Sequence, residues 1–302
     1  MKFLYLKPNK SGIGDRLFDL ILVYTYSKYL KCNELYLCWQ TDRNLMSKKY
    51  LHSYMRRIKT PFRDKDYLLH NLLKYINLPN DIIFVNKQQM DKLISEGNYK
   101  FKRHMGLRYN IYTFIEKILP NIDKDDKDKF IDSYYNNFKK ITFNNIPENI
   151  IKTFDHNEII TIHLRRGDKV VNDNGEAIGI RYSELDDLNK KTYDAINKCI
   201  SLNFKNICFV SDEKKIRNEF VEKFKNKCNI FVFDGNDYSQ TYYDIYCLVN
   251  SKFIILSQRF SVFSIFSSMI KNINLYYILD NNMIENYNKY SNVKKISDLN
   301  KL

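Results

Sequence analysis

The sequence contains little glycine and proline, with 8 Gly and 5 Pro among 302 residues. This low content excludes a collagen-like chain and a disordered chain rich in glycine and proline. Apolar residues make up 44% of the chain and aromatic residues 15%, which is enough apolar surface to build packed cores. The length suits two domains of about 150 residues each. We therefore expect a globular protein with two domains.

Long apolar runs and paired cysteine motifs are also absent. The longest apolar stretch, around residues 253–270, is interrupted by Gln258, Arg259 and several serines, so we expect no membrane span. The apolar segment at the start of the chain is too short for a secretory signal. The six cysteines show no C-x-x-C spacing, and several lie within apolar stretches. This pattern favours reduced thiols and a cytoplasmic location.

Basic residues exceed acidic ones, and the formal net charge is +14. An anionic partner such as a nucleotide diphosphate or a nucleic acid would suit this charge, although a coding sequence poor in G and C would also raise the lysine content. Abundant Tyr and Phe side chains could stack on bases, so one hypothesis is that the chain is a basic nucleic-acid-binding protein. The aromatic residues follow core periodicity, however, and no nucleic-acid motif is present. We therefore expect no nucleic-acid partner.

Strand-like and helix-like patterns alternate along the chain, which predicts an α/β fold with parallel sheets. In the first half, strands at 2–6 and 34–39 flank a helix at 15–31. The second half is more regular, and its expected strands are 159–163, 206–210, 229–233, 253–256 and 273–279. Helices are expected between these strands, at 190–201, 213–225, 240–250 and 261–271. A polar connector near residue 150 divides the chain into domains 1–150 and 151–302.

The densest group of candidate functional residues follows the expected strand 159–163. It reads His163-Leu164-Arg165-Arg166-Gly167-Asp168-Lys169. Ligands of open α/β sheets bind at the carboxyl ends of the strands. An arginine side chain offers a rigid bidentate donor that suits a diphosphate. The alternative is a surface arginine pair that forms salt bridges with Asp168.

Two other loops lie between an expected strand and the next expected helix. Gly12 and Gly14 in the first loop would let backbone N–H groups face a ligand, or would only form a tight turn. The second loop reads Ser257-Gln258-Arg259-Phe260-Ser261. Its hydroxyl and amide groups would bind a phosphate, although helix capping explains Ser261 equally well.

Metal binding is not expected from the sequence. Three D-x-D segments have the spacing by which many glycosyltransferases hold a divalent cation: 64–66, 123–125 and 126–128. The last two lie in a polar stretch rich in Lys and Asp, which is typical of a solvated helix face. The five histidines are scattered, without a pair at metal-ligand spacing.

These segments together resemble the superfamily of α1,2-, α1,6- and protein O-fucosyltransferases. The residues from His163 to Asp168 match its H-x-R-R-x-D motif at every fixed position. The segment 12–18 is similar to its G-x-G-N-R-L-F motif, with Asp15 in place of Asn, and 210–213 is similar to its F-S-D-D stretch. The last motif is approximated by 244–261, where Gln258 and Arg259 replace small hydroxyl residues.

The resemblance implies a GT-B-like fold, in which two Rossmann-like domains face a cleft. Domain 1–150 would lie on the acceptor side, and domain 151–302 would bind the nucleotide sugar. The implied reaction is an inverting, metal-independent transfer of fucose from GDP-fucose to a hydroxyl of a glycan or glycoconjugate. An alternative donor is another nucleotide deoxysugar, such as a rhamnose donor. The departures at Asp15 and Arg259 leave open a structural role with a degenerate site.

The resemblance also implies roles for individual residues. Arg165 would clamp the β-phosphate of the donor. The base that accepts the acceptor proton would be Glu176, with Asp173 and Asp15 as second and third choices. The remaining donor-binding residues would be Gly12, Gly14, Arg16, His163, Arg166, Asp168, Lys169, Asp212, Asp244, Arg259, Phe260 and Ser261.

Overall fold

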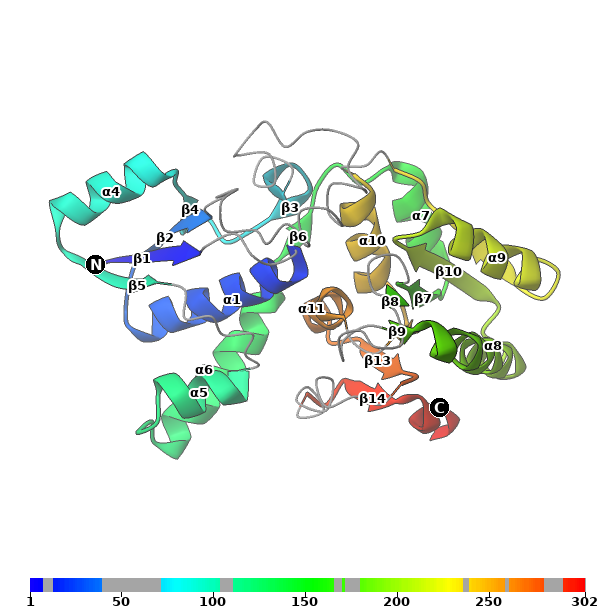
Figure 1. Ribbon diagram of the computed structural model, residues 1–302. Helices are drawn as coiled ribbons and strands as arrows, with labels where there is room; N and C mark the ends of the chain where they lie inside the picture. The colour runs from blue at the N-terminus through cyan, green and yellow to red at the C-terminus, as the bar shows by residue number, and fades with distance from the viewer. Residues whose placement is uncertain are drawn as a thin grey trace. The chain divides into compact units, whose positions relative to one another are not determined.

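The computed structural model describes nine stretches of the chain: residues 1–7, 13–39, 72–103, 111–165, 170–171, 180–235, 239–258, 261–279 and 290–301. The chain divides into two compact units, Met1–Asn144 and Asn145–Leu302. Each unit contains a parallel sheet with helices packed against it (Figure 1).

The first unit contains a four-stranded parallel sheet in the order β4-β2-β1-β5. A two-stranded antiparallel pair, β3 with β6, accompanies it. The elements are β1 (Lys2–Lys7), α1 (Ile13–Tyr29), β2 (Glu34–Trp39), β3 (Ile76–Asn77), β4 (Ile82–Phe84), α4 (Lys87–Glu96), β5 (Tyr99–Arg103), α5 (Ile111–Ile118), α6 (Lys124–Phe138) and β6 (Thr142–Phe143).

Helix α1 is buried along most of its length. It packs against α6, where Nδ2 of Asn137 donates a hydrogen bond of 3.0 Å to Oγ1 of Thr25. Helix α6 begins after Asp123, whose side chain accepts a hydrogen bond from the backbone N–H of Asp126. The acidic stretch 123–128 therefore provides the N-cap and the first turn of a helix, as expected for a solvated helix face.

The second unit contains a six-stranded parallel sheet in the order β11-β10-β7-β12-β13-β14. This is the strand order of the Rossmann fold, 3-2-1-4-5-6, and it reverses between β7 and β12. The expected α/β class with parallel sheets is confirmed. The elements are α7 (Glu148–His156), β7 (Ile160–Leu164), β8 (Val170–Val171), β9 (Ile180–Arg181), α8 (Leu185–Ser201), β10 (Asn206–Ser211), α9 (Lys214–Phe224), β11 (Asn229–Phe231), α10 (Gln240–Val249), β12 (Phe253–Leu256), α11 (Val262–Ile270), β13 (Asn274–Tyr277) and β14 (Val293–Lys295), with 3-10 turns at Tyr182–Glu184 and Ile296–Lys301.

The central strand β7 is buried on both faces, as expected for a parallel strand covered by helices. Alternate residues point to opposite faces of a sheet. Ile160, Ile162 and Leu164 belong to the apolar core that includes residues of α8 and α9. Thr161 and His163 face the other way, toward α10 and α11, where Oγ1 of Thr161 contacts the carbonyl of Cys247 at 3.5 Å. The sheet is thus covered by different helices on its two faces.

Several elements differ from the sequence expectation. Strand β11 ends at Phe231, two residues before the expected end, because the carbonyl of Phe233 accepts a hydrogen bond from a side chain instead of joining the sheet. Helix α7 and strand β5 were not expected. The alternating aromatic and basic residues of β5 suit an edge strand, which is its place in the sheet.

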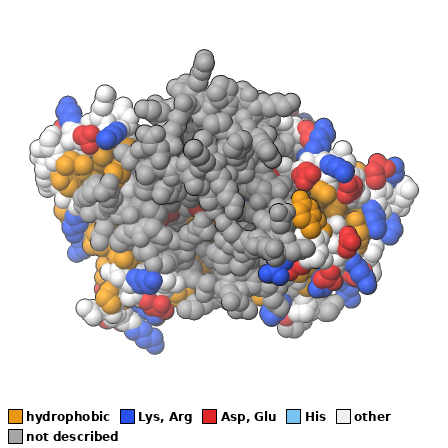
Figure 2. Space-filling view, viewed as in Figure 1, with side chains coloured by type: hydrophobic (Ala, Val, Ile, Leu, Met, Phe, Trp, Pro, Cys, Tyr) orange, Lys and Arg blue, Asp and Glu red, His pale blue; other side chains and the backbone are white. Residues whose placement is uncertain are grey.

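Charged side chains of both signs lie on the described part of the surface. On the face shown in Figure 2, Lys and Arg side chains are interspersed with Asp and Glu side chains on the described parts of both units. Many of the basic residues pair with acidic neighbours along a helix, such as Lys191 with Asp187 at 2.7 Å. The excess of positive charge therefore does not form one continuous patch on the described part of this face.

Candidate functional site

Arg165 directly follows β7, at the point where the strand order of the six-stranded sheet reverses. Its Nε atom lies 3.8 Å from Oδ2 of Asp212, and the two side chains are 26% and 22% exposed. The hydroxyl of Ser211 donates to the carbonyl of Leu164 and accepts a hydrogen bond of 3.1 Å from the N–H of Glu213. These contacts tie the ends of β7 and β10 together and bring two predicted site residues to one edge of the sheet.

His163 lies one strand position before Leu164 and is only 3% exposed. Its Nδ1 atom forms a hydrogen bond with the hydroxyl of Ser264, in the first turn of α11. Its ring centre lies 5.8 Å from the ring centre of Phe263. The side chain therefore joins the central strand to α11 and sets the position of that helix relative to the sheet.

The end of β12 is held in a similar way. The N–H of Ser257 donates to the carbonyl of His163 at 3.1 Å, and the Ser257 hydroxyl contacts Oγ1 of Thr192 in α8 at 2.6 Å. Ser261 is the N-cap of α11 and accepts a hydrogen bond of 3.3 Å from the N–H of Ser264. Ser261 thus has the capping role that the sequence offered as one of its two explanations.

Asp244 lies in the second turn of α10, and its Oδ1 atom accepts a hydrogen bond of 2.7 Å from Nε2 of Gln240. Burial raises the pKa of Asp244 to about 7, against the opposing effects of the Gln240 hydrogen bond and the positive charge of Arg217. The negative charges of Asp212 and Asp234 raise the pKa further. Carboxyl groups with such a raised pKa are candidates for functional residues, and the carboxyl ends of the strands are where ligands of open α/β sheets bind.

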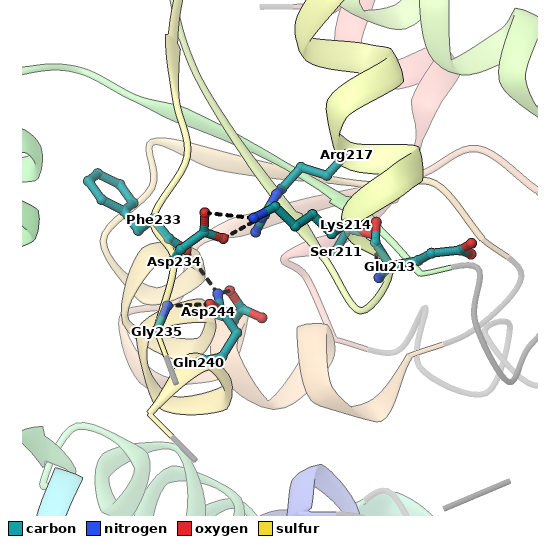
Figure 3. Close-up of polar contacts among 9 residues, drawn as sticks. All are labelled: Ser211, Glu213, Lys214, Arg217, Phe233, Asp234, Gly235, Gln240 and Asp244. Atoms are coloured by element: carbon teal, nitrogen blue, oxygen red, sulfur yellow. Dashed lines mark hydrogen bonds and ion pairs between the residues drawn. The ribbon is translucent and has the colours of Figure 1, made fainter. Parts of the chain in front are cut away.

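Sequence reasoning missed the polar cluster that surrounds Asp244 (Figure 3). Nη2 of Arg217, a residue only 4% exposed, pairs with Oδ1 of Asp234, and Nε2 of Gln240 donates to the carbonyl of Phe233 at 3.0 Å. The Asp-Gly pair at 234–235 after an expected strand is a turn signal in the sequence. The side-chain partners of this turn come from two different helices, so the sequence does not show them.

In the first unit, three predicted residues lie together in the first turn of α1. Gly14 is buried and Asp15 is partly buried. Arg16 is 1% exposed, and its guanidinium lies 5.3 Å from the ring centre of Trp39 at the carboxyl end of β2. The Trp39 ring in turn contacts the ring of Phe84, with centres 5.3 Å apart. Trp39 was not predicted as part of the site.

The other predicted residues lie outside the described part of the chain. They are Gly12, Arg166, Asp168, Lys169, Asp173, Glu176, Arg259 and Phe260.

The described residues contain no group of three or more His, Cys, Asp or Glu side chains that could hold a metal ion. In the same stretches, none of the helices has the length and apolar character needed to cross a membrane. All six cysteines belong to the described residues, and none of them forms a disulfide bond.

No protein-family model matches this chain, and no curated protein matches it in sequence. Solved structures do match it in fold. The selenomethionine form of the fucosyltransferase NodZ from Bradyrhizobium aligns with a TM-score of 0.50 and 11% identity over 88% of this chain and 91% of its own. NodZ alpha-1,6-fucosyltransferase soaked with GDP-fucose aligns at 0.48, with 14% identity over 89% of this chain and 93% of its own. POFUT1 in complex with GDP aligns at 0.48, with 12% identity over 91% and 98%. The alignment with the selenomethionine form of NodZ shows that the chain has the fold of that fucosyltransferase.

Proposed function

We propose that this chain is a glycosyltransferase that moves fucose from GDP-fucose to a hydroxyl of a glycan or glycoconjugate. The observation that carries the proposal is the position of Arg165, beside Asp212 at the reversal of strand order, in a fold shared with the fucosyltransferase NodZ. The choice of GDP-fucose rests on the H-x-R-R-x-D motif in the sequence. An arginine recognises the diphosphate and not the sugar, so another deoxysugar nucleotide is the alternative donor.

The proposed reaction breaks the bond between the anomeric carbon and the β-phosphate oxygen. A bond forms between that carbon and the acceptor oxygen on the opposite side, which inverts the anomeric centre. Negative charge develops on the departing GDP, and the guanidinium of Arg165 would stabilise it. Oδ2 of Asp212 lies 3.8 Å from Nε of Arg165. Asp212 would hold the guanidinium at the strand end until a diphosphate competes for the guanidinium.

The proton of the acceptor hydroxyl must move to a base during the transfer. Glu176 is the proposed base, and Asp173 and Asp15 are the alternatives. Asp15 lies in the first turn of α1. The two other carboxylates follow the H-x-R-R-x-D motif in the sequence.

The remaining predicted residues are proposed to bind the donor. Asp212 and Asp244 would contact the nucleoside or support its pocket, and His163 and Ser261 would support the phosphate loops through α11. The others proposed to bind the donor are Gly12, Gly14, Arg16, Arg166, Asp168, Lys169, Arg259 and Phe260.

The larger organisation is part of the same proposal. Domain 151–302 would bind the donor, domain 1–150 would lie on the acceptor side, and the acceptor would enter a cleft between them. The arginine residues would neutralise the diphosphate without a metal ion. A cytoplasmic location is proposed from the cysteine pattern.

Nucleotide titration tests the proposal directly. Calorimetry and thermal shift with GDP, GDP-fucose, a GDP-rhamnose donor and UDP, with and without EDTA, should show stabilisation by guanine nucleotides that EDTA does not change. Replacing Arg165 with Ala should lower turnover on the order of a hundred- to a thousand-fold while the protein stays folded. Near-normal turnover in this variant would contradict the assigned role.

Lys252→Ala is the matched control. Lys252 lies just before β12, at the amino edge of the same sheet, where its Nζ atom pairs with Glu158 at 2.7 Å. The control removes one positive charge, as Arg165→Ala does, but at the opposite edge. It should therefore bind GDP as the unmodified protein does. Binding to single-stranded nucleic acid without a response to any nucleotide sugar would instead support the nucleic-acid reading.

A further inference from the structure

The loop after β11 is joined to the start of α10 by one amide side chain (Figure 3). Nε2 of Gln240 donates to the carbonyl of Phe233 at 3.0 Å and to Oδ1 of Asp244 at 2.7 Å. Oε1 of Gln240 accepts a hydrogen bond of 2.6 Å from the N–H of Gly235. Gln240 therefore links the two backbone groups of the loop to the carboxylate of α10.

These partners allow only one orientation of the Gln240 amide. The N–H of Gly235 can only donate, so it must face Oε1, and the carbonyl of Phe233 can only accept, so it must face Nε2. A rotated amide would place like groups against each other at both positions. The amide can therefore only donate to Asp244, which favours the ionised form of that carboxyl.

Ion pairs hold the other side of the loop. Asp234 pairs with the buried guanidinium of Arg217 and lies 3.7 Å from Nζ of Lys214, both on α9. The loop is also closely packed at Gly235. A Cβ atom at this position would lie 2.5 Å from Oγ of Ser239 and 2.8 Å from the backbone N of Gln240. The loop therefore has little freedom to move away from Gln240.

The charged groups that face Asp244 come from several elements. Asp212 follows β10, Arg217 lies on α9 and Asp234 lies on the loop after β11. On α10 itself, the neutral Gln240 donates to it and the buried thiol of Cys247 lies within electrostatic reach. Burial and the two acidic neighbours oppose ionisation of Asp244, whereas Gln240 and Arg217 support it.

We propose that Gln240 is a positioning residue for the nucleoside end of the donor site, because it holds the 233–235 loop and presents only an N–H donor to the carboxyl of Asp244. This inference rests on the proposed function. A nucleoside presents N–H and O–H donors on its base and ribose, and an ionised carboxylate accepts them more strongly than a protonated one. The nucleoside would thus bind to the state of Asp244 that Gln240 supports.

The test is the pH dependence of GDP binding, measured by calorimetry between pH 5.5 and 9. In the unmodified protein, binding should weaken as the pH falls through the pKa of Asp244, which is about 7. In Gln240→Ala, the missing donor should move this midpoint to higher pH. If the midpoint moves up by about one pH unit, the affinity for GDP should fall about tenfold at a pH below the midpoint. The loss should appear mainly in KM for the donor, with a smaller change in kcat.

A second variant separates this role from simple damage to the loop. Gln240→Glu keeps the size of the side chain and an acceptor for the N–H of Gly235. Its carboxyl can donate to Asp244 only while protonated, because two facing carboxylates resist a second ionisation. Above the second ionisation of this pair, the introduced carboxylate donates neither to the carbonyl of Phe233 nor to Asp244, so affinity for GDP should fall again at high pH, where that of the unmodified protein is highest. General damage to the loop would not add this second, opposing limb to the pH profile.

Asn250→Ala is the control, because it removes an amide at the other end of α10, where Nδ2 of Asn250 donates to the carbonyl of Tyr246 at 2.8 Å. Its binding midpoint should stay unchanged. The inference is overturned if the protein binds GDP and depends on Arg165, but both Gln240 variants keep the original pH profile. If the unmodified protein binds no guanine nucleotide at any pH, the proposed function fails and this inference fails with it.

Discussion

Replacing Asp244 with asparagine should stabilise the second unit, and the gain should depend on pH. Burial raises the pKa of this carboxyl from 3.8 to about 7. In the unfolded chain the group titrates near its ordinary value. Between these two values the folded state binds more protons than the unfolded state, so the free energy of unfolding falls as the pH rises through this window. Above about pH 7 the full cost of the partly desolvated charge is present.

The magnitude follows from the size of the shift. A difference of about three pKa units between the folded and unfolded states lowers the free energy of unfolding by at most about 4 kcal/mol at pH 8. The substituted amide would carry no charge, and its side-chain oxygen could still accept the hydrogen bond from Gln240. The stability difference between Asp244→Asn and the unmodified protein should therefore grow by up to about 1.4 kcal/mol per pH unit between pH 5 and 7 and then level off.

Urea unfolding followed by circular dichroism at several pH values measures this difference. The single tryptophan, Trp39, lies in the first unit, so its fluorescence follows that unit separately. Asp187→Asn is the control, because Asp187 is an exposed residue of α8 that pairs with Lys191 on the helix surface. A stability difference that stays constant from pH 5 to 8.5 would refute the reasoning. A stabilising variant that binds GDP more weakly would show that the partly buried carboxylate is retained for function.

Two further substitutions test the packing around the site. Gly235→Ala should destabilise the second unit by about 1–3 kcal/mol in urea unfolding and weaken GDP binding, because the added methyl group would force the loop away from Gln240. If stability and GDP affinity are unchanged, the loop is not tightly packed at Gly235. Ser264→Ala should lower the free energy of unfolding by about 1–3 kcal/mol in thermal unfolding, because the buried His163 loses its hydroxyl partner on α11. Ser267→Ala is the control, because the Ser267 hydroxyl donates to the carbonyl of Phe263 in the same helix, at 2.9 Å.

Much of the fold could be predicted from local patterns. The bounds of β2 and β12 agree with the sequence expectation, because a short apolar strand between polar residues has a clear signature. Helix α8 begins at Leu185, five residues before the expected start, because its first turn is polar and shows little apolar periodicity. Helix α7 follows Pro147 and buries only Ile150 and Phe154, so its apolar pattern is short.

The sequence by itself determined the alternation of strand and helix, and it placed Arg165 at the end of a buried strand. Apolar periodicity and the position of polar residues after a strand are local properties, so they can be read along the chain. Only the tertiary structure decided that His163 turns toward Ser264, 101 residues later, and that Gln240 binds the loop after β11 and Asp244 together. Strand order and side-chain partners depend on contacts between distant segments, and these contacts leave no local pattern in the sequence.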